Sequence, residues 1–125
     1  MDFLLSVKGI GIVTASIIVA ETNGFTGFTS IKQLTSYAGL DVRIRESGKW
    51  KGKSKISKHG NKYIRGALYM PSMSYKTHNK KARLFYDRIN QRTGNGLIAI
   101  VAVERKLLGL MYSLWKKEEM FKEYD

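Results

Sequence analysis

The longest apolar stretch of the chain, residues 97–117, constrains the possible fold more than any other feature. It contains no proline and is long enough for about six turns of α-helix. Its first uninterrupted apolar run stops at Glu104, Arg105 and Lys106, well short of the roughly 20 apolar residues that a membrane span needs. We therefore expect residues 97–117 to be the central helix of a globular core, and we expect no membrane partner.

Helical spacing of apolar residues recurs along the rest of the 125-residue chain, which has the length of a single domain. We expect a mostly α protein with a helical hairpin over residues 1–24, a basic extended loop with possible short strands over 41–60, and a helical core over 61–117. Pro71 should kink or interrupt the core helix that begins near Asn61. Shorter helices are expected over residues 2–6, 12–22 and 80–92, and from a capping box at Ser30 to Gly39.

The same spacing predicts which apolar side chains face the core. Asn23 and Gly24 should end the second helix. Tyr69 is also expected in the core, whereas Lys62 and Arg65 should point outward. The expected inward side chains are Ile12, Ala15, Ile18, Val19, Ile31, Leu34, Ala38, Ile64, Leu68, Met73, Leu84, Phe85 and Ile89.

The formal net charge of +12 is concentrated in one part of the chain. Residues 41–66 carry nine basic and two acidic side chains, and residues 76–92 carry six basic side chains and one acidic one. Residues 1–40 and 93–125 each have a net charge of zero. Such a block favours a polyphosphate partner, DNA or RNA, over the alternative of a solvated basic face.

The composition also argues against several kinds of site. The chain has no cysteine, which rules out a disulfide scaffold, a cysteine nucleophile and a zinc site built on cysteine. Its two histidines argue against a dense histidine metal site, so we expect no metal and no cofactor within these residues. The N-terminus lacks the pattern of a signal peptide, so a cytoplasmic location is expected.

Leu4-Leu5, Gly9-Ile10-Gly11 and Thr14-Ala15 form the pattern of a helix-hairpin-helix motif. Glycines let a turn approach a phosphate closely, and the turn leads into a helix N-terminus whose free N–H groups favour an anion. Lys8, Gly9 and Gly11 are therefore candidate contacts to a nucleic-acid backbone. The alternative is an ordinary corner between two helices, in which the glycines only permit close packing.

The basic loop contains three serines, Ser47, Ser54 and Ser57, that could act as nucleophiles. A serine hydroxyl needs a base or a metal to activate it, and attack on a phosphodiester needs cations to neutralise the developing charge. From chemistry alone the three serines remain alternatives, together with a turn or cap role for each. Cations in the same segment are Arg43, Arg45, Lys49 and Lys51.

A longer set of residues follows the hairpin in a fixed order. It comprises Tyr37-Ala38-Gly39-Leu40, Arg43, Glu46-Ser47-Gly48, Gly52, Ile56-Ser57-Lys58-His59-Gly60-Asn61, Tyr63-Ile64-Arg65 and Ala67-Leu68-Tyr69-Met70. From Leu4 to about Trp115, the chain resembles the C-terminal domain of the DEDD transposases of insertion-sequence family one hundred and ten, with their one-sixteen and nine-oh-two relatives. These are related to Piv-type DNA invertases and are described as bridge-RNA-guided recombinases.

The resemblance implies a two-part enzyme that exchanges DNA strands through a covalent phosphoserine intermediate. It implies that Ser47 is the nucleophile and that an N-terminal RuvC-like domain binds Mg²⁺ through four acidic residues. It also implies a structured guide RNA that specifies the DNA sites. Because Met1 falls within the first hairpin helix, we expect no RuvC-like domain in this chain, and we expect the chain alone to be catalytically inert.

Several further residues of the basic region are expected to contact DNA or RNA. His59 could instead be a general base, Ser57 could cap the helix that begins near Asn61, and Trp50 could stack on bases or only anchor the loop. The expected contacts beyond the hairpin are Arg43, Arg45, Lys49, Trp50, Lys51, Lys53, Lys55, Ser57, Lys58, His59, Asn61, Lys62 and Arg65.

Two other functions remain open at this point. The chain could be a non-enzymatic helix-hairpin-helix module that binds DNA or RNA. It could also form homo-oligomers through the apolar helix over residues 97–115.

Overall fold

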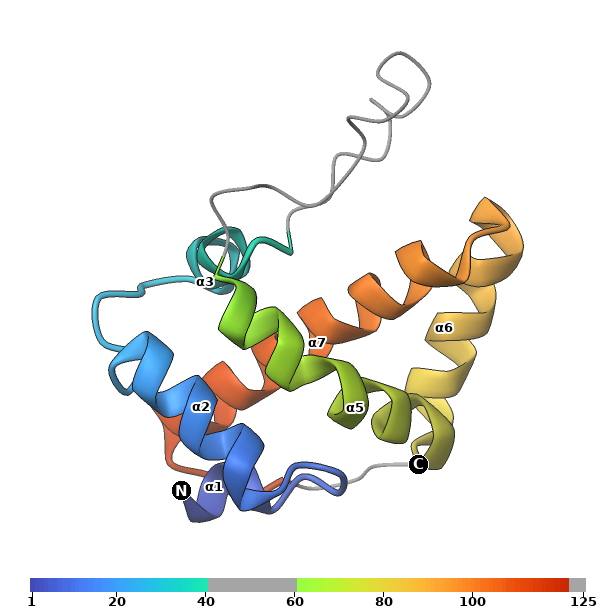
Figure 1. Ribbon diagram of the computed structural model, residues 1–125. Coiled ribbons are helices and arrows are strands. Elements are labelled where there is room, and N and C mark those ends of the chain that lie inside the picture. Colours follow the sequence, from blue (N-terminus) through green and yellow to red (C-terminus); the bar gives the residue numbers. More distant parts are fainter. Residues whose placement is uncertain (41–60, 122–125) are drawn as a thin grey trace.

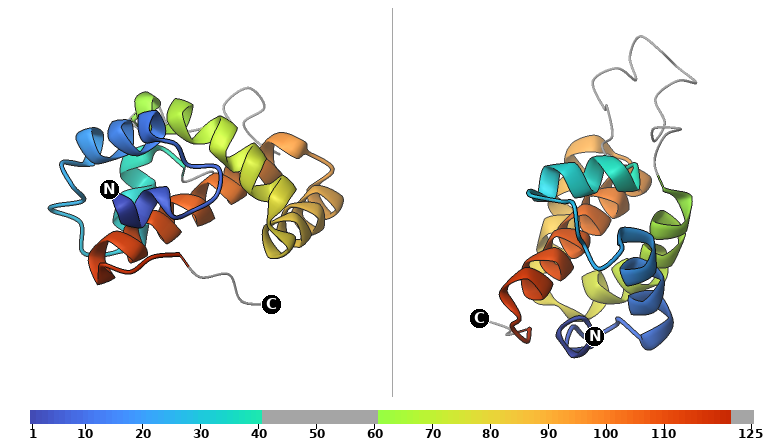
Figure 2. Two further views of the ribbon diagram at one scale, coloured as in Figure 1. Left: turned by 90° about the horizontal axis from the view of Figure 1, so that it is seen from below. Right: turned by 90° about the vertical axis from the view of Figure 1, so that its left-hand side faces the viewer.

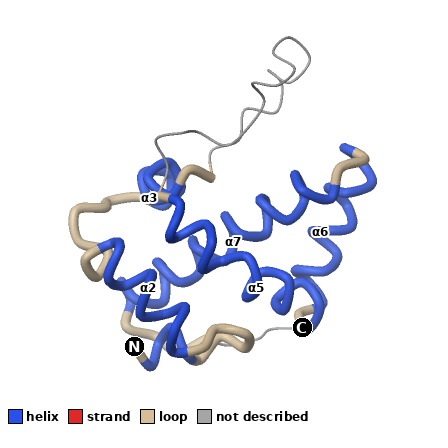
Figure 3. Tube along the Cα trace, in the orientation of Figure 1, coloured by secondary structure: helices blue, strands red, loops and turns tan. Residues whose placement is uncertain are grey.

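The computed structural model describes residues 1–40 and 61–121, which are built from α-helices and loops (Figures 1 and 3). These two ranges contain no strand, which confirms the mostly α prediction. The basic loop and its possible strands lie outside the described residues. The helices are α1 (Asp2–Leu5), α2 (Ile12–Thr22), α3 (Ile31–Ala38), α5 (Lys62–His78), α6 (Lys80–Thr93) and α7 (Gly96–Lys117).

Helix α7 is the centre of the fold, as its apolar sequence predicts. It packs against α1, α3, α5 and α6, and Figure 1 shows α6 beside its first turns and α1 near its last. The side view in Figure 2 shows α2 and α5 together on one side of it. Leu107, Leu108 and Met111 are completely buried. Burial stabilises the fold by roughly 1.5–3 kcal/mol for each such side chain.

A membrane-spanning helix is absent from the described ranges. Even α7, with its 22 residues, does not combine the necessary length with the necessary apolarity.

Close packing of α3 on α7 depends on Gly109. A Cβ atom at Gly109 would lie 3.2 Å from Cγ2 of Ile31 on α3. That distance is tighter than an ordinary van der Waals contact, so a larger side chain would push α3 away from α7.

Local signals begin and end α3 where the sequence predicts. Oγ of Ser30 accepts a hydrogen bond from the backbone N–H of Gln33 at 3.2 Å. Oε1 of Gln33 accepts from the backbone N–H of Thr29 at 2.8 Å, one residue earlier than in a standard capping box. Gly39 ends the helix in the left-handed conformation, with φ of +77°, and Asn23 ends α2 in the same way.

The predicted hairpin joins α1 to α2 and packs directly against α5. Gly9 adopts φ of +102°, and a Cβ atom there would lie 3.0 Å from Oγ and 3.2 Å from Cβ of Ser74. Both the backbone conformation and the close approach of α5 therefore favour glycine at this position.

Helix α5 continues through Pro71, so the proline does not interrupt it. Proline lacks the N–H that would bond to the carbonyl of Ala67 four residues earlier. The hydroxyl of Thr14 on α2 donates to this carbonyl at 3.4 Å, which partly replaces the missing bond. A side chain of the hairpin thus compensates for a proline in the core helix.

The prediction of inward side chains is wrong at four positions and correct elsewhere, where the side chains are buried or half-buried. Each exception lies at a position that the neighbouring helices do not fully cover, and Ile31 is exposed although it also contacts Gly109 of α7. On α6, Ala82 and Ile89 are buried on one face, and Leu84 lies about 200° around the helix from Ala82. The exposed side chains are Ile12 (57%), Ile31 (41%), Tyr69 (48%) and Leu84 (59%).

We expect Gly9→Ala to lower the free energy of unfolding by about 1–3 kcal/mol, because alanine disfavours this φ and its Cβ would press on Ser74. Gly11→Ala is the matched control, since Gly11 has φ of −94° and nothing lies within 4 Å of its Cβ position. Urea denaturation of both variants measures the difference. Equal stability of the two variants would contradict the packing role of Gly9.

Candidate functional site

Most of the predicted site residues fall in the segment between α3 and α5, outside the described residues. These are Arg43, Arg45, Ser47, Lys49, Trp50, Lys51, Lys53, Lys55, Ser57, Lys58 and His59. The described ones form two groups, one in the hairpin and one at the start of α5. They are Lys8, Gly9 and Gly11 in the first group, and Asn61, Lys62 and Arg65 in the second.

The two groups lie at opposite ends of the α2–α5 pair (Figure 1). These helices are antiparallel, because Gly9 before α2 lies against Ser74, whereas Glu21 near the end of α2 bonds to Asn61. The hairpin turn and the start of α5 are therefore separated by roughly 15–20 Å, the rise of about a dozen helical residues. The structure does not bring the two groups into one compact site.

The N-terminal end of α2 is open. Gly11 is the N-cap and offers no side-chain bond, and a Cβ atom there would meet nothing within 4 Å. Ile12 and Val13, which follow it, are exposed. The first N–H groups of α2 thus face a surface that an anion can approach. The two glycines therefore differ in their surroundings, because Gly9 packs against Ser74 whereas the space beside Gly11 is open.

Three hydrogen bonds join the residues that closely precede and follow the 41–60 segment, one of them from Nδ2 of Asn61 to the hydroxyl of Tyr37 at 3.4 Å. The backbone N–H of Asn61 donates to the carbonyl of Tyr37 at 2.9 Å. Nη1 of Arg65 donates to the carbonyl of Ala38 at 3.2 Å. We call these four residues the stem, because they fix the point at which the basic segment leaves and rejoins the helical body.

Asn61 has a structural role in the stem. Its Oδ1 accepts bonds from the backbone N–H groups of Tyr63 and Ile64 at 2.9 and 3.0 Å. Its Nδ2 donates to Oε1 of Glu21 at 2.8 Å. Asn61, rather than Ser57, is therefore the N-cap of α5, and its amide group is engaged within the protein.

Arg65 is half-buried rather than outward-pointing, and it interacts electrostatically with Glu104. Glu104 is 5% exposed, and burial raises the pKa of its carboxyl from 4.5 to about 7, while the positive charge of Arg65 acts to lower it. In the sequence, Glu104 stands out only as the end of an apolar run. Its position on the same helical face as Ile100, Leu107 and Leu108 is the signal that could have indicated its burial.

Lys62 and Tyr63 form an exposed surface next to the stem. Tyr63 is 60% exposed, and Nζ of Lys62 lies 5.5 Å from the centroid of its ring. An exposed ring beside a cation suits stacking on a base together with contact to a phosphate. The sequence predicted Lys62 as a nucleic-acid contact, and its exposure is compatible with that prediction.

The described part of the chain offers no cluster of side chains that could bind a metal ion. Over residues 1–40 and 61–121, no three His, Cys, Asp or Glu side chains lie close enough together to hold one. The Mg²⁺ that the resemblance implies therefore has no candidate ligand set among these side chains.

Comparison with known proteins gives consistent matches. A sequence model described as the transposase IS116/IS110/IS902 family matches residues 1–87. The chain is 32% identical over 122 residues to the pilin gene-inverting protein of Moraxella bovis, covering 96% of this chain and 38% of that protein. It is 23% identical over 111 residues to the uncharacterized 43.6 kDa protein of insertion element IS110 of Streptomyces coelicolor, covering 89% and 27%.

A probable family 20 transposase of Pseudomonas aeruginosa is 25% identical over 124 residues, covering 95% of this chain and 36% of that protein. The chain thus spans less than two-fifths of the length of these three relatives.

We expect Asn61→Ala to lower the free energy of unfolding by about 2 kcal/mol, and the matched variant Asn95→Ala by about 1 kcal/mol. Both variants lose an N-cap, since Oδ1 of Asn95 accepts bonds from the N–H groups of Leu97 and Ile98. Only Asn61→Ala also loses the bond to Glu21. Urea denaturation measures both losses, and equal losses would contradict a role for the Asn61 side chain in holding the stem.

We expect Glu104→Gln to change how stability depends on pH. The carboxyl of Glu104 has a pKa of about 7 in the folded protein, against 4.5 ordinarily. Between these values the folded state binds more protons than the unfolded state, so wild-type stability falls as pH rises. Glutamine does not ionise, so the variant should gain about 3 kcal/mol relative to wild type between pH 4 and pH 8. Parallel stability curves, measured by urea denaturation over this range, would contradict the raised pKa.

Proposed function

Because this chain belongs to the IS116/IS110/IS902 transposase family, we propose that it is the part of a transposase or recombinase that binds DNA and supplies the nucleophile for strand exchange. The match over residues 1–87 is the observation that supports this most directly, because it runs through the hairpin, the basic segment and α5. The relatives from Moraxella, named for inverting a pilin gene, support a rearrangement of DNA as the reaction.

DNA binding is supported by charge and by the open end of α2. Residues 41–66 carry nine basic side chains, and an electrostatic contact of that size weakens steeply as salt rises. The N-terminus of α2 at Gly11 offers a contact to the DNA backbone at one end of the α2–α5 pair, and the exposed Lys62 and Tyr63 offer a phosphate contact and a stacking surface at the other end. These contacts recognise backbone and stacked bases rather than base edges, so they would bind DNA without reading its sequence.

In the proposed reaction, Oγ of Ser47 attacks the phosphorus of a DNA phosphodiester. A bond forms between Oγ and phosphorus, and the bond from phosphorus to one deoxyribose oxygen breaks. The proton of the serine passes to a base, and the leaving oxygen takes up a proton. A deoxyribose hydroxyl of another strand then attacks the phosphoserine and releases Ser47. Each step replaces one P–O bond with another, so the exchange needs no oxidant or reductant.

The chain supplies cations for this reaction in the same segment. Arg43, Arg45 and Lys49 are within four residues of Ser47 in the sequence. Their charges would neutralise the negative charge that develops on the phosphoryl oxygens during attack. Gly48, next to the serine, would let the segment approach the sugar-phosphate backbone closely.

The other requirements of strand exchange are proposed to be met elsewhere. We propose that acidic residues of an RuvC-like domain hold Mg²⁺, that a structured guide RNA selects the DNA sites, and that the reaction takes place on cytoplasmic DNA. We expect residues 1–125 by themselves to bind DNA through the basic segment and the start of α2.

We expect Ser47→Ala in the full-length protein to abolish DNA strand exchange while changing DNA affinity less than about twofold, because the hydroxyl reacts but carries no charge. Ser54→Ala is the matched control, because Ser54 lies in the same basic segment. A recombination assay and a filter-binding assay at fixed salt measure the two effects.

Unimpaired recombination by Ser47→Ala would overturn the nucleophile assignment. If neither serine variant affects recombination, Ser57→Ala is tested in the same way, and normal recombination by that variant too favours the alternative of a non-enzymatic helix-hairpin-helix module that binds DNA or RNA. If Ser54→Ala abolishes recombination and Ser47→Ala does not, the nucleophile is Ser54.

A further inference from the structure

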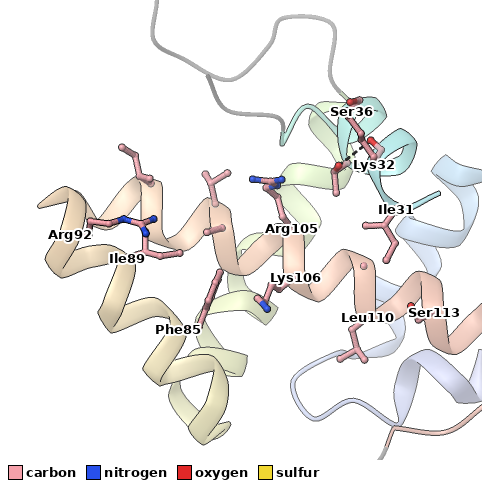
Figure 4. A pocket seen from close by; sticks show the side chains of 15 residues that line it. Ile31, Lys32, Ser36, Phe85, Ile89, Arg92, Arg105, Lys106, Leu110 and Ser113 are labelled. Atoms are coloured by element: carbon pink, nitrogen blue, oxygen red, sulfur yellow. Dashed lines mark hydrogen bonds between the residues drawn. The ribbon is translucent and has the colours of Figure 1, made fainter. Parts of the chain in front are cut away.

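A groove of about 790 Å³ runs along α7 between α3 and α6 (Figure 4). On α7 its lining extends from Ile98 to Ser113. At the helical rise, this is about 22 Å, or roughly four turns of a helix lying alongside. The groove uses neither the hairpin nor the stem, so it is distinct from the residues to which the proposed function assigns DNA contact.

The floor of the groove is apolar and only half-buried. Ile98, Ala102 and Leu110 line it from α7, and each retains exposed surface. Ile31 of α3 and Phe85 of α6 add apolar surface on the two sides. Covering these side chains would remove apolar surface from water, which is favourable in proportion to the area covered.

Cations lie along both edges of this apolar floor. In Figure 4, Arg105 and Lys106 project from opposite sides of α7, and Lys106 points toward Phe85 of α6. Nζ of Lys106 lies 4.6 Å from the centroid of the Phe85 ring. Lys32 on α3 and Arg92 on α6 also line the groove, and none of its described lining residues is acidic. The positive charge is thus uncompensated within the lining.

We propose that this groove binds an amphipathic α-helix of a protein partner, whose apolar stripe is flanked by carboxylates on both sides. The apolar stripe would cover Ala102 and its neighbours on the floor. The carboxylates would pair with Arg105 on one edge and Lys106 on the other. A helix laid in a groove is a recurrent mode of peptide recognition, and the four-turn length and the two charged edges fit it.

Other occupants fit these observations less well. A second copy of this chain carries the same net charge of +12, so its approach to a basic groove is disfavoured electrostatically. A nucleic-acid strand would pair its phosphates with the cations, but its hydrophilic backbone would leave the floor at Ile98 and Leu110 without an apolar partner. An acidic amphipathic helix can both pair with the cations at the edges and cover the apolar side chains of the floor.

The test uses a designed 16-residue peptide with a leucine stripe flanked by glutamates, and its binding to the whole chain is measured by fluorescence anisotropy. We expect the double variant Arg105→Glu/Lys106→Glu to weaken binding by about tenfold or more. The matched control is Lys80→Glu/Lys81→Glu, which changes the net charge equally on exposed residues outside the groove. This control should leave the peptide affinity within about twofold.

Two further measurements test the contribution of the apolar floor separately from that of the cations. Ala102→Trp should fill the groove and weaken peptide binding by a similar factor. Circular dichroism and a thermal melt check that this variant folds. A peptide of the same composition with a scrambled order has no apolar stripe, and it should bind at least about tenfold more weakly.

Three results would overturn the proposal. Equal loss of peptide affinity in the groove variant and in the Lys80/Lys81 control would show that the peptide binds through general charge attraction and not in the groove. Absence of peptide binding, with duplex or single-stranded DNA affinity lost only in the groove variant, would make the groove a nucleic-acid surface. Absence of peptide binding, with self-association that is lost only in the groove variant, would make it an interface between copies.

Discussion

The burial of α7 is the interaction on which the rest of the structure depends. Helices α1 and α3, with four and eight residues, are too short to be stable alone. They are held because Leu4 and Leu34 are completely buried in the same cluster as Leu107 and Leu108 of α7. The close approach at Gly109 then sets the position of α3, and with it the point at which the basic segment begins.

This scaffold places the two described groups of candidate site residues apart from one another. The hairpin is fixed to one end of α5 by Gly9 and Ser74, and the stem is fixed to the other end by Asn61 and Arg65. A nucleic acid that contacts both would therefore extend along the α2–α5 pair. The buried carboxyl of Glu104 connects the scaffold to the stem, because its charge interacts with that of Arg65.

The local parts of the fold could be predicted from the sequence because their signals are local. The cap at Ser30 and the left-handed residues Asn23 and Gly39 act within a few residues of themselves. By contrast, the exposure of Tyr69 and Leu84 depends on which side of each helix a distant helix covers, and that cannot be read from spacing alone.

The candidate site shows the same division. Asn61 was predicted to contact nucleic acid, yet its side chain caps α5 and bonds to Glu21, a residue 40 positions earlier in the chain. The hydrogen bond from Thr14 to the carbonyl left free by Pro71 also joins segments that are far apart in the sequence, so no local pattern predicts it. The role of Ser47 stays a prediction, because it rests on the family and on the charge around it and lies outside the described residues.

The central claim is that a serine of the basic segment becomes covalently joined to DNA. Mass spectrometry of the peptide that remains attached to DNA, after the full-length protein has reacted with a substrate that traps the intermediate, tests this directly. The account predicts one modified peptide, with the nucleotide on Ser47. A nucleotide on Ser54, on Ser57 or on a tyrosine, or strand exchange without any covalent adduct, would contradict it.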